Sequence, residues 1–343
     1  MFPRGSRRVA LCPQAWLAWS LGHFFPPSGT LNVSSLRKGV GRVEKMRSFN
    51  EGKSTWVQVD ERDMTRIGNL QEKYHLSDEM VLYSLDTHER ARVEYDSETA
   101  AVLVIFNVPQ RQKVENHYET SPMAFILKEG RLFTFTNGDT NYVNEMIEKL
   151  LHHNPTQSPY SLLFHTLFLI SSAFYPLIEE VNNERTRLNK KLREKTTNKS
   201  LIAMSDLDIG LIYLLTATKQ NAALLQQMGV QRMHRMLNET EKEQLEDALI
   251  EANQAMEMTQ LASQILEQLS GTYNNLLNNN LNDTMKFLTV WSLLLTVPTI
   301  VTGFFGMNVP LPFSDSTFGA AIAMLISLVL AIWMLVAMWR RIK

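Results

Sequence analysis

The segment Phe287–Phe305 reads FLTVWSLLLTVPTIVTGFF and contains no charged residue. A second apolar segment, Phe318–Trp339, follows it, and Asp315 is the only charged residue between Lys286 and Arg340. A helix of about 20 apolar residues is long enough to cross the hydrocarbon core of a bilayer. A helix buried in a soluble core can also be apolar on all sides, but two such runs in succession favour two transmembrane helices.

The charges beside these segments predict their orientation. We place the transmembrane helices at 286–306 and 318–339, joined by a loop, 307–317, that contains neither Lys nor Arg. Lys286 begins the first helix, and the tail 340–343 after the second is basic, with Arg340, Arg341 and Lys343. Because basic residues accumulate on the cytoplasmic side of membrane proteins, both flanks are expected in the cytoplasm and the loop outside.

The beginning of the chain is basic and free of acids up to residue 43, with Arg4, Arg7, Arg8, Arg37, Lys38 and Arg42. This composition is compatible with a mitochondrial transit peptide, whereas a secretory signal would need a small-residue cleavage site that is missing here. From Met46 onward the composition is typical of a folded domain. We therefore expect residues 1–45 to be a disordered leader or an upstream extension.

The expected membrane is the plasma membrane of a bacterium, with the mitochondrial inner membrane as the alternative.

Residues 46–157 have the pattern of a cytoplasmic α/β domain. Two stretches carry apolar residues at helical spacing, Asp63–His75 and Ser77–Glu89, the second with Ser77 as its N-cap. Val102–Phe106 is apolar at every position, which indicates a central strand with both faces covered. Four stretches rich in Val, Ile and Phe predict strands, at Arg92–Tyr95, Ala101–Val108, Met123–Lys128 and Arg131–Thr136.

Residues 158–285 are expected to be a helical stalk region. Two long periodic segments, Ser158–Glu194 and Leu201–Leu237, are joined by the polar turn Lys195–Ser200. A third segment begins at the capping-box pattern Thr240–Glu243.

The third segment continues into the membrane without a proline before Pro298. One helix from Thr240 to Gly306 would be about 100 Å long at 1.5 Å per residue. Such a periodic run favours a stalk packed against copies of itself, and the alternative is a break near Gly271. Its apolar stripe comprises Leu245, Leu249, Ala252, Met256, Thr259, Ala262, Leu266, Leu269, Tyr273 and Leu276.

Polar and small side chains form a stripe along the first transmembrane segment. They recur in steps of three and four and therefore share one face: Asn282, Met285, Thr289, Ser292, Thr296, Thr299, Gly303 and Gly306. The opposite face is apolar, with Phe287, Val290, Trp291, Leu294, Leu295, Val301 and Phe305.

Polar groups are costly against lipid, so this polar stripe must face protein or water. Helix–helix packing and a water-filled pore both satisfy that requirement. Two helices cannot enclose a pore, so the second interpretation requires several identical subunits. An Asn-rich mouth would then precede the stripe, with Asn274, Asn275, Asn278, Asn279, Asn280 and Asn282.

The end of the first span carries a motif, Thr302-Gly303-Phe304-Phe305-Gly306-Met307-Asn308. With its Gly-Met-Asn at this position, followed by a short loop, one more span and a basic tail, the chain resembles the CorA family of magnesium transporters. The resemblance covers about residues 46–343. It implies a cytoplasmic α/β domain, long stalk helices and two transmembrane helices per subunit in a homopentamer, with the first span lining the pore and the second surrounding it.

The resemblance also implies roles for single residues. Asn308 corresponds to the selectivity asparagine of the family, and Gly306 and Met307 shape the turn that presents it. Asp247 lies where the family places an intersubunit regulatory magnesium site, although its usual partner acid is missing from the strand end Asn107–Gln110. The positions that match the inner constriction are Asn282, Met285, Leu288 and Thr296.

These observations predict a potential-driven channel that carries hydrated Mg²⁺, with Mg²⁺ also as regulator and Co²⁺, Ni²⁺ or Zn²⁺ as further substrates. The first alternative is a zinc or cobalt transporter of the same superfamily. The second is a membrane-anchored coiled-coil scaffold, which predicts no ion flux and no need for Asn308.

Other classes find little support. The net charge of -1 gives no basis for nucleic-acid binding, the single Cys12 excludes a disulfide framework, and no catalytic constellation indicates an enzyme. Glu51–Thr55 resembles the end of a P-loop, but Arg47 stands where the motif needs Gly and no strand is evident before it.

Overall fold

The structure is a computed structural model that describes residues 45–60, 70–194, 197–230, 232–307 and 318–342. The chain divides into two units, residues 1–43 and residues 44–343, and all described residues belong to the second. The expected leader up to residue 44, most of the helix predicted at Asp63–His75, and the residues Asn308 and Asp315 lie outside the described residues.

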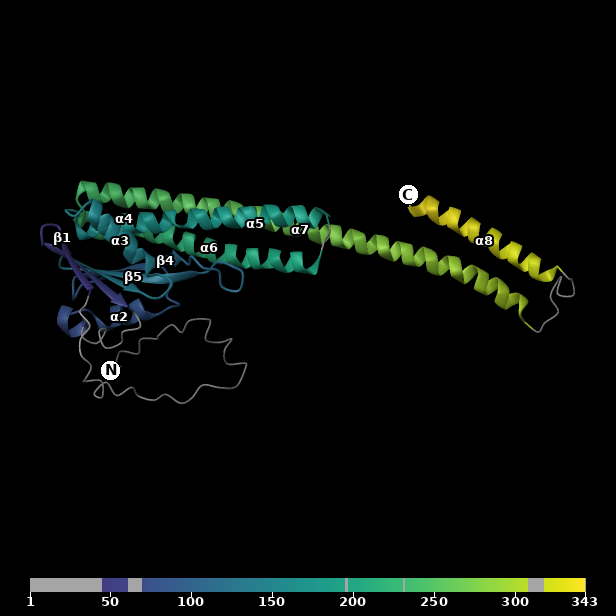
Figure 1. Ribbon diagram of the computed structural model, residues 1–343, viewed down its shortest axis with the longest axis horizontal. Helices are drawn as coiled ribbons and strands as arrows, with labels where there is room; N and C mark the ends of the chain where they lie inside the picture. The colour runs from purple at the N-terminus through teal and green to yellow at the C-terminus, as the bar shows by residue number, and fades with distance from the viewer. Residues whose placement is uncertain (1–44, 61–69, 195–196, 231, 308–317, 343) are drawn as a thin grey trace, which may run out of the picture. The chain divides into compact units, whose positions relative to one another are not determined.

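A six-stranded mixed sheet with the order β1-β2-β6-β5-β4-β3 forms the first part of this unit (Figure 1). The pair β2–β6 is parallel, and the other neighbours are antiparallel. The four predicted strands are confirmed as β3 to β6. The bounds are β1 Lys45–Phe49, β2 Ser54–Asp60, β3 Arg92–Asp96, β4 Ala101–Pro109, β5 Thr120–Lys128 and β6 Arg131–Thr136.

The hairpin of β1 and β2 was missing from the sequence prediction. Its turn contains Asn50, Glu51 and Gly52, all with positive φ, and Gly52 tolerates its φ of 83° without steric cost. The statement that no strand precedes Glu51–Thr55 is therefore wrong, because β1 ends at Phe49. A P-loop leads into a helix, whereas this turn leads into a second strand, so a nucleotide site is still not supported.

Both faces of the sheet are covered, as the apolar run of β4 predicted. Every residue of β4 is buried, and its side chains alternate between two clusters because neighbouring residues of a strand point to opposite faces. Leu103 and Ile105 pack on the side of α2 (Asp78–Leu85). Val104 and Phe106 pack with the long helices.

The helices after the sheet begin with α3 (Tyr142–His153), which was not predicted. The segment predicted as Ser158–Glu194 is divided at Ala173 into α4 (Pro159–Ser172) and α5 (Phe174–Glu194). Ser158 caps α4, since its hydroxyl accepts the Ser161 N–H at 3.1 Å. The segment predicted as Leu201–Leu237 is α6 (Asn198–Val230) followed by the short 3-10 helix η3 (Arg232–Met236).

The helix α7 (Glu239–Phe305) is continuous over 67 residues, so the alternative of a break at Gly271 is wrong. The capping box lies two residues earlier than predicted, because Asn238 caps the helix and Glu241 returns the bond to the Asn238 N–H. The predicted apolar stripe is buried from Leu245 to Tyr273, partly so at Leu249, Met256 and Leu269, and Leu276 is exposed. Tyr273 is the last buried residue of the stripe, and its hydroxyl donates to Asn189 Oδ1 of α5 at 2.9 Å.

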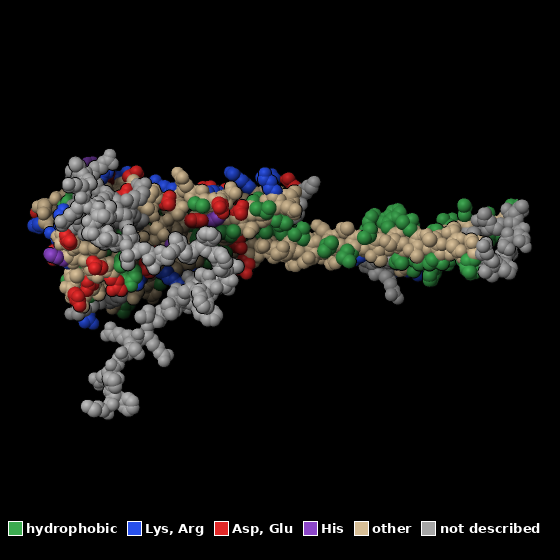
Figure 2. Space-filling view, turned by 90° about the horizontal axis from the view of Figure 1, so that it is seen from below, with side chains coloured by type: hydrophobic (Ala, Val, Ile, Leu, Met, Phe, Trp, Pro, Cys, Tyr) green, Lys and Arg blue, Asp and Glu red, His purple; other side chains and the backbone are tan. Residues whose placement is uncertain are grey.

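Beyond Tyr273, α7 continues away from the other long helices and meets α8 (Gly319–Ile342), which runs back along it (Figure 1). No residue of α7 between Tyr273 and Val297 is buried in this chain. Charged side chains gather over the sheet and the long helices, whereas this part of α7 shows patches of hydrophobic side chains among uncharged ones (Figure 2).

Among the described residues, three helical stretches are long and apolar enough to cross a membrane, Pro159–Glu194, Asn198–Val230 and Glu239–Phe305. In the first two, 61% and 39% of the most apolar window is buried inside the protein, against 11% in α7. The first two pack on the sheet and on α7, so their apolar residues are used within the fold. The predicted spans correspond to the end of α7 and to α8, which includes the apolar stretch Met324–Ala337.

Candidate functional site

The part of α7 that is predicted to cross the membrane has one face that packs against α8. Val290 and Leu294 line a small gap together with Ala331, Met334 and Leu335 of α8. Val297 and Val301 continue the same row in steps of three and four and are each 8% exposed. Val290, Leu294 and Val301 were predicted on the apolar face, Val297 was not, and Phe287 and Leu295 of that face stay exposed.

The polar stripe lies on the other side of α7. All eight of its residues, from Asn282 to Gly306, are exposed in this chain. Since each residue turns an α-helix by about 100°, Thr299 lies about 200° around the axis from Val297. The stripe therefore faces away from α8 and is free to meet other copies of the chain or water.

The stripe presents oxygen atoms as hydrogen-bond acceptors. The hydroxyls of Thr289, Thr296 and Thr299 donate to the carbonyls of Met285, Ser292 and Leu295, at 2.8, 2.7 and 2.9 Å. A hydroxyl has one proton and two lone pairs, so these bonds use the proton and leave acceptor capacity on the oxygen. Such a surface suits a partner that donates hydrogen bonds, as the water shell of a cation does.

The end of the stripe at Asn282 carries uncharged side chains. The six asparagines of the predicted mouth are exposed, and so are Met285 and Leu288, at 58% and 65%. Asp283 and Lys286 lie in this region, but they form an ion pair at 3.0 Å and belong to the side of α7 that faces α8. Of the residues matched to the inner constriction, Asn282, Met285 and Leu288 therefore offer amide and apolar side chains here, and Thr296 adds a hydroxyl further along the stripe.

At its other end, α7 is followed by the C-cap residue Gly306. Its N–H donates to the Thr302 carbonyl at 2.9 Å, and a Cβ at this position would lie 3.2 Å from the same oxygen. The tight approach explains a glycine here. Met307 follows, 53% exposed, and Asn308 lies outside the described residues.

Asp247 is exposed on α7. Burial lowers the pKa of His165 on α4, and the carboxylate of Asp247 opposes that shift. Within the described part of the chain, no group of three or more His, Cys, Asp or Glu side chains is arranged to hold a metal.

The end of β4, where the family resemblance would place a partner acid for Asp247, is hydrogen-bonded to α6. The Asn107 N–H donates to Asn221 Oδ1 at 2.9 Å, and Asn221 Nδ2 donates back to the Asn107 carbonyl at 2.8 Å. This end of β4 is thus used for packing, and the regulatory role of Asp247 stays a prediction.

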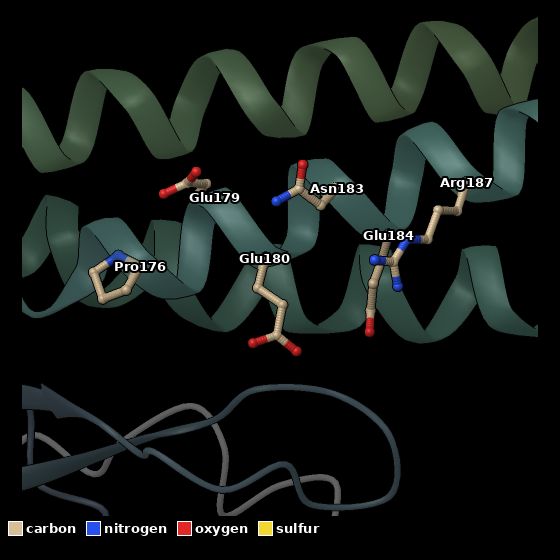
Figure 3. Close-up of a pocket in the computed structure, with 6 residues that line it drawn as sticks. All are labelled: Pro176, Glu179, Glu180, Asn183, Glu184 and Arg187. Atoms are coloured by element: carbon tan, nitrogen blue, oxygen red, sulfur yellow. The ribbon is translucent and has the colours of Figure 1, made fainter.

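A hollow of about 320 Å³ on α5 carries three acids, Glu179, Glu180 and Glu184 (Figure 3). Lys113 of the β4–β5 loop lies 3.1 Å from Glu180 and 2.6 Å from Glu184. Tyr118 donates to Glu180 at 2.6 Å, which lowers the pKa of that carboxyl. The sequence did not indicate this cluster, because Lys113 is 71 positions from Glu184. Because Lys113 pairs with two of the three acids, we interpret Glu180 and Glu184 as a structural contact between the β4–β5 loop and α5.

Known proteins resemble this chain over most of its length. The family model described as CorA-like Mg²⁺ transporter protein matches residues 51–341. A cobalt/magnesium transport protein CorA from Methanocaldococcus jannaschii is 22% identical over 294 residues, which cover 82% of this chain and 90% of that protein.

Two solved structures have a related fold. The complete structure of the CorA magnesium transporter from Methanocaldococcus jannaschii aligns with a TM-score of 0.72 at 22% identity, covering 86% of this chain and 92% of that one. The cytoplasmic domain of ZntB from Vibrio parahaemolyticus aligns with a TM-score of 0.52 at 11% identity, covering 66% of this chain and 88% of that one.

Proposed function

The chain belongs to the CorA-like Mg²⁺ transporter family, and from this premise we propose that it conducts hydrated Mg²⁺ through a homopentameric channel. Membership makes it a membrane protein that transports divalent cations and not an enzyme. The ion that it prefers, the number of subunits and the path of the ion are the proposed parts.

The observation that carries the proposal is the orientation of the polar stripe. Val297 and Val301 pack toward α8, and Thr299 faces the opposite side. A polar face at membrane depth is stable only against protein or water. Copies of α7 arranged around an axis would place their stripes in a common pore, with each α8 on the outside. The number of five copies comes from the family.

In this arrangement Asn308 forms a ring of amide oxygens at the outer end of the pore, presented by the turn at Gly306 and Met307. Mg²⁺ gives up its water reluctantly, and carboxylates would hold it too firmly for conduction. Amide oxygens accept hydrogen bonds from the water shell without displacing it. Below the ring, the acceptor oxygens of Thr299, Thr296, Ser292 and Thr289 offer the same chemistry, with Gly303 leaving the pore wide.

Met285 and Leu288 form the gate of the proposed channel, with Asn282 on its cytoplasmic side. Apolar rings close a pore because water leaves a narrow hydrophobic constriction. Small polar replacements of Met285 or Leu288 should therefore leak ions, and an unchanged closed state would reject this gate.

The residues 46–285 and the tail 340–343 lie in the cytoplasm in this proposal, as the basic flanks predict. The membrane is the plasma membrane of a bacterium, with the mitochondrial inner membrane as the alternative. A negative interior potential drives uptake, since two charges gain about 4.6 kcal/mol per 100 mV. Cytoplasmic Mg²⁺ bound near Asp247 between subunits acts as the regulator, and Asp247→Asn should make uptake less sensitive to internal Mg²⁺.

Metal flux into liposomes that contain the purified full chain tests the proposal. Wild type should admit Mg²⁺, and Asn308→Ala should lose uptake or selectivity while still assembling. Competition by Co²⁺, Ni²⁺ and Zn²⁺ separates a magnesium channel from a zinc or cobalt transporter. A complete lack of flux for every metal would favour the scaffold alternative.

A further inference from the structure

A groove of about 630 Å³ lies between α7 and α8 at the end where α8 finishes. Its walls are apolar, with Phe287, Trp291 and Leu294 on α7 and Leu335 on α8. Asp283 and Lys286 form its rim and are paired at 3.0 Å. The volume lies in the range of about 300–1,000 Å³ that small-molecule sites occupy.

The groove opens on the side of α7 that is turned away from the polar stripe. Leu294 lies two residues from both Ser292 and Thr296, about 200° around the helix from each. Phe287 and Trp291 flank this face and are 63% and 50% exposed, with their rings in an edge-to-face contact at 5.9 Å. If the stripes meet at a pore, the groove faces the lipid.

The charge at this end of the two helices is positive. Lys286 offsets Asp283, and Arg340 is exposed at the end of α8. Arg340 lies five residues beyond Leu335, which is about 7.5 Å along a helix. Arg341 and Lys343 add two more positive charges to the same short segment, and Asp283 is the only acid in either flank, 282–286 or 336–343.

We propose that the groove binds one anionic phospholipid, with an acyl chain along Phe287, Trp291 and Leu335 and the phosphate near Lys286 and the basic end of α8. An apolar slot that lies next to the basic end of α8 matches both parts of that ligand. The inference rests on the proposed function in one respect, because it is the pore that turns this face toward lipid.

Brominated phospholipids test the inference, since bromine quenches tryptophan fluorescence only at short range. The full chain with Trp333→Phe and Trp339→Phe retains Trp291 as its tryptophan within the predicted spans, and adding Trp291→Phe gives the background signal. The protein is placed in phosphatidylcholine vesicles that contain increasing fractions of brominated phosphatidylglycerol or brominated phosphatidylcholine. Half-maximal quenching of Trp291 should need roughly fivefold less of the anionic lipid.

Lys286→Gln should reduce that preference toward equality. Lys242→Gln is the matched control, because Lys242 forms the same kind of ion pair three residues back, with Glu239 at 2.7 Å, near the start of α7. Its preference should match that of wild type.

Equal quenching by the two lipids would overturn the inference, and so would the absence of quenching by either, which is expected if a second copy of the chain covers the groove. Mg²⁺ flux measured in the same vesicles separates the two proposals. Flux without lipid preference rejects the groove alone, and lipid preference without flux rejects the channel alone.

Discussion

Val297 and Thr299 lie two residues apart in α7 and face opposite sides of the helix. Val297 is 8% exposed and continues the row that packs on α8, whereas Thr299 is exposed and donates its hydroxyl to the Leu295 carbonyl at 2.9 Å. One helix thus has a face for its own second span and a polar face for which the single chain provides no cover. The proposed pore depends on this division.

Thr299→Val should slow Mg²⁺ uptake without preventing assembly, because it replaces an acceptor oxygen on the stripe by a methyl group of similar size. The loss of one hydrogen bond to the hydrated ion, about 0.5–1.5 kcal/mol, corresponds to a rate that is lower by roughly twofold to thirteenfold. Thr302→Val is the matched control, since Thr302 also donates to a carbonyl one turn back, at 2.9 Å, but lies off the stripe. Equal effects of the two variants on uptake would argue against the pore face.

Tyr273→Phe should weaken the contact between α7 and α5. The buried hydroxyl donates to the Asn189 carbonyl at 3.0 Å and to Asn189 Oδ1 at 2.9 Å, and its loss should cost about 0.5–1.5 kcal/mol of unfolding free energy. Denaturant unfolding of the detergent-solubilised protein measures it. Tyr213→Phe keeps the ring stacked on His117 and should change stability less. A Tyr273→Phe protein as stable as wild type would contradict the role of this bond.

The pH dependence of stability should report on Glu180. The Tyr118 hydroxyl, and then Lys113, hold the pKa of Glu180 below its ordinary value of 4.5 in the folded protein. A carboxyl with a lowered folded pKa stabilises the fold above the unfolded pKa, and this contribution is lost as the pH falls through the folded value.

Tyr118→Phe should therefore lower the melting temperature at pH 7, and the difference from wild type should shrink once the pH falls below about 4.5. Thermal unfolding followed from pH 7 to pH 3.5 provides the measurement. A difference that stays constant over the whole range would show that Tyr118 acts through packing alone.

Asn238→Ala should destabilise the start of α7 by about 1 kcal/mol. Asn238 accepts the Glu241 N–H at 2.9 Å, and Glu241 also accepts the Ser158 hydroxyl at 2.5 Å, so the cap links α7 to the start of α4. Asn278→Ala, at an exposed position inside the same helix, should be neutral or slightly stabilising because Ala favours helices. Amide hydrogen exchange should locate the loss in the first turn of α7, and unchanged protection there would contradict it.

Local patterns predicted most of the fold. The strands β3 to β6 are short runs of Val, Ile and Phe between turns, and α7 has a regular stripe and no proline before Pro298. The hairpin of β1 and β2 was not predicted, because β1 is exposed at four of its five residues and carries no apolar run. The parallel pairing of β2 with β6 joins residues more than 70 positions apart, such as Thr55 and Arg131, which no local pattern reveals.

The candidate site, too, was predictable from the sequence only in part. The spacing of Thr289, Ser292 and Thr296 was sufficient to predict a polar face, because helical periodicity is a local property. Whether that face packs against another helix or lines a water-filled pore depends on other copies of the chain. A partner for Asp247 depends on them as well. The contact of Lys113 with Glu180 depends on how a loop of the sheet meets α5, and it therefore needed the structure.

Accessibility of single cysteines during Mg²⁺ flux tests the central claim most directly. In a Cys12→Ser background, which removes the only native cysteine, Ser292→Cys and Trp291→Cys place a thiol on adjacent residues at the same depth of the bilayer. A charged, membrane-impermeant thiol reagent should block flux through the Ser292→Cys protein and leave the Trp291→Cys protein conducting. Block at Trp291→Cys with full flux at Ser292→Cys would contradict the account, because the polar stripe would then lie outside the water-filled path.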